Sequence, residues 1–119
     1  MEKINLIQKL DFIKEHWSPK IIGEVNDVYV KLVKFQGEFV WHFHEEEDEL
    51  FYVIKGTMVM KLRGKDIELK EGECIIVPKG VEHMPVSDEE VHLMLVEPKS
   101  TENTGNIQSE RTVKDLDRI

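Results

Sequence analysis

Between residues 20 and 98 the apolar positions recur mainly at every second residue, in short runs separated by turn signals. Met58 and Met60, for example, share one face of a run whose other face carries Lys61. Such alternation places one face of a strand on a core and the other in water. The pattern predicts strands at 20–25, 27–35, 39–44, 49–54, 57–63, 66–70, 73–78, 83–87 and 90–98. Short strands at this spacing, with almost no helix between them, indicate an antiparallel sandwich or barrel.

The first residues follow a helical period instead. Apolar residues recur at helical intervals at Leu6, Ile7, Leu10 and Ile13. Asn5 precedes them and has capping-box spacing to Gln8, which predicts the start of a helix. We expect the helix to continue to Trp17 and to end at Ser18, because a residue before proline is pushed away from helical geometry.

The composition changes again after Pro98, where the chain becomes polar and charged. We therefore predict an N-terminal helical segment at 1–18, one β domain at 19–98 and a polar tail at 99–119. The tail has too little apolar surface for a core of its own. Three arrangements are open for it: over the barrel, against a neighbouring subunit, or mobile.

Length and charge narrow the classes of function. At 119 residues the chain has room for one core, and 24 acidic against 16 basic residues give a net charge of -8. This charge repels nucleic-acid phosphates and anionic lipid, so we expect neither as a partner. No apolar run approaches the roughly 20 residues of a membrane helix. With no signal-peptide pattern and a single cysteine, Cys74, we expect a cytoplasmic protein, and we expect Cys74 to be a buried structural thiol.

The stretch WHFHEEEDELF carries the candidate chemistry. On a strand, His42 and His44 point the same way about 7 Å apart, so both imidazoles can reach one metal ion. Five acids follow, and antiparallel pairing through the turn brings Glu49 alongside the histidines, although the parity of its strand does not select a face. A third histidine, His83, follows a bend at Pro78 and Gly80. A solvated acidic turn beside two surface histidines is the alternative.

At this point the chain resembles the cupin superfamily, whose two motifs it matches in order. The first motif is carried here by Gly37, His42, His44, Glu49 and Gly56, with one residue fewer than the family pattern between Gly37 and His42. The second is carried by Gly72, Pro78, Gly80 and His83, with Ser87 where the family has asparagine. Neither departure touches a ligand position.

The resemblance implies an all-β, double-stranded β-helix or jelly-roll barrel with metal ligands His42, His44, Glu49 and His83. Asp48 is the alternative carboxylate, and a degenerate site of hydrogen-bonded histidines is the alternative to a metal site. The expected cofactor is a divalent transition metal: Fe, Mn, Ni, Zn, Co or Cu.

The resemblance also implies a small-molecule ligand and, by analogy with the family, a homodimer. We expect a metal-dependent enzyme of dioxygenase or isomerase type acting on a small oxygenated molecule, in which Glu49 either stays on the metal or leaves it to act as a catalytic base. A non-catalytic module that binds or senses a small molecule or metal is the alternative. His16 and His92 have no motif partner and are expected to be surface or satisfied histidines.

Overall fold

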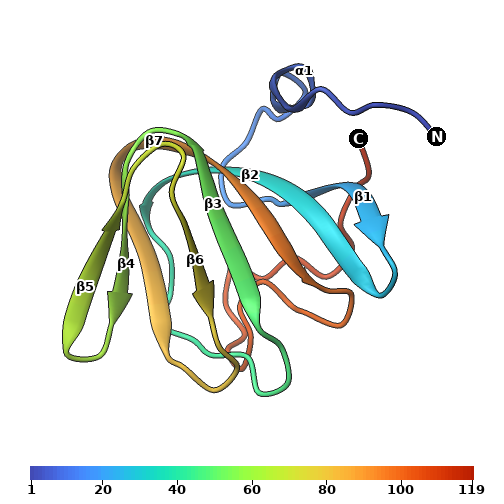
Figure 1. Ribbon diagram of the computed structural model, residues 1–119. Helices are drawn as coiled ribbons and strands as arrows, with labels where there is room; N and C mark the ends of the chain where they lie inside the picture. The colour runs from blue at the N-terminus through green and yellow to red at the C-terminus, as the bar shows by residue number, and fades with distance from the viewer.

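The computed structural model describes residues 1–119 and is built almost wholly from antiparallel strands (Figure 1). In chain order the elements are α1 (Leu6–Leu10), β1 (Lys20–Val25), β2 (Val28–Glu38), β3 (Glu49–Lys55), β4 (Met58–Leu62), β5 (Lys65–Leu69), β6 (Cys74–Val77) and β7 (His83–Pro98). The prediction of an all-β fold with a short N-terminal helix is confirmed. No helix is long and apolar enough to cross a membrane.

The sixteen-residue strand β7 organises the sheet. One of its edges pairs with β2 over most of its length. On the other edge its first half pairs with β4 and its second half with β3, so the strand order divides in the middle of β7. The two branches, β4–β5 and β3–β6, curl the sheet around a core (Figure 1). The predicted hairpin turn at 63–66 is present between β4 and β5, where Leu62 pairs with Lys65.

The core lies on the concave face and contains the alternate residues of the strands. Its eleven buried members are Val33, Phe35, Phe51, Val53, Met58, Met60, Leu69, Val77, Val91, Leu93 and Leu95. Burying each such side chain contributes about 1.5–3 kcal/mol, and together they hold both branches of the sheet against β7. The two methionines expected in the core are there.

The N-terminal helix is shorter than expected. Asn5 caps it as predicted, with its side-chain oxygen accepting from the N–H of Gln8 at 3.0 Å, but the helix ends at Leu10. The next residues tighten into turns, and Trp17 has φ 62°, a left-handed conformation that cannot continue a right-handed helix. Ile13 is buried all the same, which explains why its position fitted the helical period.

Two predictions about the strands and one about Cys74 were wrong. Segment 39–44 is not a strand: only His42 forms an isolated bridge, and its partner is His83 and not the start of β3. The predicted strands 83–87 and 90–98 are one continuous strand, β7. Cys74 is exposed, because β6 pairs only with β3 and lies at the edge of the sheet.

The polar tail packs on the barrel, which selects one of the three arrangements open to it. Its last residues run parallel to β1, where the N–H of Ile119 donates to the carbonyl oxygen of Ile21 at 3.0 Å. Thr104 is fully buried, although the tail is polar. Its hydroxyl lies 2.6 Å from both the carbonyl oxygen of Ile107 and the hydroxyl of Thr112, so this buried polar group has its partners within the tail.

Candidate metal centre

Three separate segments bring four candidate side chains to one end of the barrel. Glu49 is the first residue of β3, and His83 is the first residue of β7. The extended segment 39–44 runs beside His83, where His42 and His83 exchange two backbone hydrogen bonds of 3.1 and 2.9 Å. His44 follows two residues later and therefore projects to the same side as His42. The histidines meet through this bridge and not through a hairpin with β3.

The four side chains form one buried cluster. His42, His44, Glu49 and His83 are 3%, 4%, 4% and 0% exposed. One potential ligand atom from each lies within 4.8 Å of the others. Glu49 Oε1 is 3.2 Å from His44 Nε2 and 3.5 Å from His83 Nε2. The structure thus brings together all four residues that the sequence motifs select.

Two of the imidazoles are oriented by backbone carbonyls. Nδ1 of His42 donates to the carbonyl oxygen of Val40, and Nδ1 of His83 donates to that of Val81, both at 2.9 Å. A carbonyl oxygen only accepts, so the proton lies on Nδ1 and the lone pair lies on Nε2. Nε2 of both rings is thereby left free to bind a cation, the arrangement by which metal-binding histidines are usually held.

The remaining atoms of the cluster lack partners within the protein. His44 Nδ1 and Nε2, Glu49 Oε1 and His83 Nε2 are buried without a hydrogen bond. Leaving such groups unsatisfied costs about 1–3 kcal/mol each. A divalent transition metal would satisfy several of them together, and imidazole with carboxylate is a donor set that Fe, Zn, Ni and their neighbours accept. The residues present therefore fit a metal ion.

Burial and mutual charge control the protonation of the cluster. Burial, with the nearby His83, lowers the pKa of His42 to about 4, so this imidazole is neutral at pH 7 and able to act as a ligand. Burial alone would raise the pKa of Glu49, but the nearby Glu97 carboxyl and the neighbouring imidazoles of His44 and His83 outweigh burial and hold this pKa well below its usual range. Glu49 is consequently the anionic group of the cluster.

Glu97, at the far end of β7, extends the polar region beyond the four candidate ligands. It is 2% exposed, and its Oε1 accepts from Lys31 Nζ at 2.6 Å in an ion pair that is itself buried. Burial and the charge of Glu49 raise the pKa of Glu97 well above its usual range. Lys31, Glu97 and Glu49 thus form a connected group of buried titratable side chains inside the barrel.

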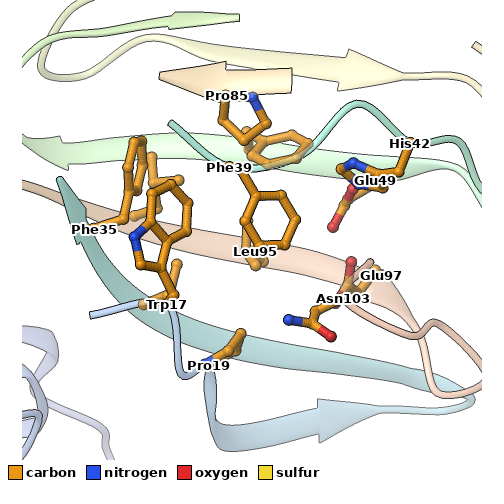
Figure 2. Close-up of a pocket in the computed structure, with 13 residues that line it drawn as sticks. Trp17, Pro19, Phe35, Phe39, His42, Glu49, Pro85, Leu95, Glu97 and Asn103 are labelled. Carbon is orange, nitrogen blue, oxygen red and sulfur yellow. The ribbon is translucent and has the colours of Figure 1, made fainter. Parts of the chain in front are cut away.

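A cavity of about 50 Å³ adjoins the cluster. Its lining is polar at one end and apolar elsewhere, and is formed by Trp17, Pro19, Val33, Phe35, Phe39, His42, Glu49, Phe51, Pro85, Leu93, Leu95, Glu97 and Asn103 (Figure 2). The side chains of His42, Glu49, Glu97 and Asn103 gather on one side of the view, the rings of Trp17 and Phe35 lie on the other, and the ring of Phe39 lies between them (Figure 2). The cavity is far smaller than the roughly 300–1,000 Å³ of sites for drug-sized ligands and smaller than the roughly 150 Å³ that holds a benzene, so even a small organic molecule requires its lining to move apart.

Trp17 closes the apolar side of this cavity from outside the barrel. Its ring stacks on Phe39 with centroids 5.0 Å apart and lies 4.7 Å from the ring of Phe35. The guanidinium of Arg111, in the tail, lies 4.6 Å from the centre of the same ring. A left-handed conformation at a bulky residue costs about 1–3 kcal/mol, and these contacts hold it in place.

The other candidate residues lie outside the cluster. Asp48, the alternative carboxylate, accepts the backbone N–H of Lys79 at 2.9 Å. His16 and His92 contact Glu90 through their Nε2 atoms at 2.7 and 2.9 Å, and these hydrogen bonds lower the pKa of Glu90 to about 2. Both histidines are satisfied near the surface, as expected.

Sequence reasoning missed three residues around the cavity. Lys31 and Glu97 carry no motif, and their strands read as ordinary alternating segments. The available signal was a lysine and a glutamate at inward positions of two paired strands. Lys31 pairs with Leu95 in register, and Glu97 follows Leu95 by two residues, so it lies on the same face of its strand. Trp17 had no signal, since its place depends on a turn that the helical pattern concealed.

Comparison with known proteins supplies independent findings. The family model for the cupin domain matches residues 29–97. The uncharacterised protein YdbB of Bacillus subtilis is 35% identical over 99 residues, which cover 82% of this chain and 88% of YdbB. The crystal structure of a cupin-2 domain protein from Shewanella frigidimarina superposes with a TM-score of 0.79 at 47% identity, covering 80% of this chain and 93% of that one. A 3-hydroxyanthranilate 3,4-dioxygenase of Xenopus tropicalis is 29% identical over 90 residues, which cover 69% of this chain but 32% of the dioxygenase.

Proposed function

We propose that this chain, which belongs to the cupin domain family, is a metal-dependent dioxygenase. Its substrate in this proposal is a small aromatic molecule bearing a hydroxyl group. The observation that carries the proposal is the position of the His/His/Glu/His cluster at the polar end of a cavity with apolar, largely aromatic walls. An aromatic ring would pack well against such walls once the lining moves apart to admit it, whereas a sugar, the substrate of an isomerase, would leave its hydroxyl groups without partners there. The dioxygenase is therefore preferred to the isomerase.

In this proposal His42, His44, Glu49 and His83 hold a divalent transition metal. Three neutral imidazoles and one carboxylate contribute a charge of -1 and leave the bound ion a net positive centre. When bound, such an ion supplies Lewis acidity and, if it is Fe(II), dioxygen activation. The sequence and the donor set are compatible with Fe, Mn, Ni, Zn, Co or Cu.

The chain's own side chains bind the substrate and handle its proton. The substrate ring lies against Trp17 and Phe39, with its hydroxyl directed toward the cluster. Glu49 is the proposed catalytic residue, because its Oε1 lies 3.2 Å from His44 in the cluster, where the carboxylate either stays on the metal or leaves it to take the proton of that hydroxyl. The aromatic walls exclude water from the reacting end.

The comparisons support the reaction class without identifying the substrate. The Xenopus tropicalis relative is, by its name, a dioxygenase of a hydroxylated aromatic acid, and its likeness to this chain extends over 69% of the chain. Because the aligned part is 32% of that enzyme, the activity and substrate of the whole relative come here only as a proposal. We further propose a homodimer, in which Ile7 and Phe12, 71% and 67% exposed, supply apolar contact surface.

The test is oxygen uptake by metal-loaded protein. Protein purified without a metal-affinity tag is loaded anaerobically with Fe(II) and offered catechol, 2-aminophenol, keto-enols and sugar phosphates in an oxygen electrode. We expect oxygen uptake with the aromatic compounds, none with sugar phosphates, and loss of the uptake in His42→Ala. Binding of aromatic ligands with no turnover under any metal would instead favour a non-catalytic binding module.

A further inference from the structure

The short backbone segment 42–44, which carries two candidate ligands, receives hydrogen bonds from the barrel on one side only. His42 is held through both of its backbone groups by His83, and the carbonyl oxygen of His44 accepts from Gly80 at 2.8 Å. In an extended segment the intervening residue directs its N–H and C=O to the opposite side. The N–H and C=O of Phe43 therefore point away from β7 and need partners from elsewhere.

Asn106, in the tail, supplies both partners. Its Oδ1 accepts the N–H of Phe43 at 2.9 Å, and its own N–H donates to the carbonyl oxygen of Phe43 at 3.0 Å. Asn106 thus pairs with Phe43 in the way that a neighbouring strand would. The pairing fixes the short segment that carries His42 and His44 from the side opposite to β7.

The tail approaches this segment so closely that glycine is required beside Asn106. A Cβ at Gly105 would clash with the carbonyl oxygen of Phe43 and would lie 3.2 Å from Cδ2 of the His42 ring. Gly105 also has φ 54°, in the left-handed region. A second contact is made nearby, where the hydroxyl of Ser100 donates to Glu47 Oε2 at 2.6 Å. The tail therefore contacts the loop on both sides of His44, at Phe43 and at Glu47.

We infer that the tail is a working part of the metal centre, in which Asn106 is a positioning residue that sets the direction of His42 and His44 through the backbone of Phe43. The inference rests on the proposal that the cluster holds a metal. It goes beyond the family relationship, because the cupin match ends at residue 97 and the tail residues that contact the loop, Ser100, Gly105 and Asn106, all lie in the following segment. Affinity for the ion is consequently controlled from outside the family's barrel.

The test compares Co(II) binding in the parent chain and three variants. Asn106→Ala removes the side-chain acceptor, whereas Asn106→Asp keeps an acceptor oxygen at the same place. Gln108→Ala is the matched control, because Gln108 is an exposed tail residue that contacts Glu102 and not the loop. Co(II) affinity is measured by competition with a chelator, and the visible d–d absorption of bound Co(II) reports its coordination geometry. Circular dichroism confirms that each variant is folded at the temperature used.

We expect Asn106→Ala to weaken Co(II) binding roughly 10- to 100-fold and to change the absorption spectrum, as loss of a group that orients metal ligands does. Asn106→Asp and Gln108→Ala should bind within about 3-fold of the parent with the parental spectrum. Equal affinity and spectrum in a folded Asn106→Ala variant would overturn the inference while leaving the proposed metal site intact. A parent protein that binds no Co(II) would overturn the proposed function, and this inference with it.

Discussion

Acid should destabilise the metal-free protein through His42 in a pH window that the structure defines. The imidazole has a pKa of about 4 in the folded protein and 6.5 as a model group. The unfolded chain therefore binds more protons between these values, and stability falls as the pH decreases from 6.5 toward 4. The full difference between the two pKa values corresponds to about 3 kcal/mol of the free energy of unfolding, of which about 2.5 kcal/mol is lost at pH 4.5.

The assay is urea unfolding of chelator-treated protein at pH 7 and pH 4.5, followed by circular dichroism. Other groups also titrate in this range, so the informative quantity is the comparison with His42→Gln, which keeps a polar side chain but cannot gain a proton. Between the two pH values the parent should lose about 2.5 kcal/mol more of its free energy of unfolding than the variant loses. An equal loss in both proteins would refute the reasoning, because it would mean that His42 is not held neutral by burial.

Three further outcomes follow from the same structure. Glu49→Gln should weaken metal binding on the order of 100-fold or more, whereas Glu46→Gln, in the acidic turn, should leave it unchanged in an equilibrium titration with Zn(II). Met60→Ala should lower the free energy of unfolding by about 2–5 kcal/mol in chemical denaturation, since the side chain is fully buried, and a loss below 1 kcal/mol would contradict the core described. Gly56→Ala should lower the free energy of unfolding by roughly 2–4 kcal/mol, because the new Cβ would lie 2.9 Å from the carbonyl oxygen of Glu90. Gly64→Ala should lower it by only about 1 kcal/mol, because Gly64 also has a positive φ, 91°, but has open space around it. Equal melting temperatures of the two variants would count against this packing.

The strands were predictable because their burial alternates locally. In β4 and β5 the inward residues recur at every second position, and the turn between them contains a glycine, so the local sequence predicts the hairpin. The segment 39–44 has the same local pattern but forms no regular strand. Its partners are His83 and Asn106, which lie far along the chain, and no local period reports a pairing over such distances.

The candidate ligands were predictable for a different reason. Their identity came from motif spacing, and the structure brings His42, His44, Glu49 and His83 into one cluster through a bridge that the predicted hairpin did not include. The residues around them were not predictable from spacing. Trp17 depends on a left-handed turn, and Asn106 depends on how a polar tail folds back over the barrel. Both are consequences of tertiary packing.

The metal content of the purified protein shows whether the His/His/Glu/His cluster is a metal site. Protein purified without a metal-affinity tag, exposed to Fe(II), Zn(II) and Co(II) in turn and freed of excess ion, is measured by elemental analysis beside a His42→Ala/His83→Ala variant. We expect about one tightly held ion per chain in the parent and almost none in the variant. A folded parent that holds no stoichiometric metal, or a variant that holds as much as the parent, would contradict this expectation.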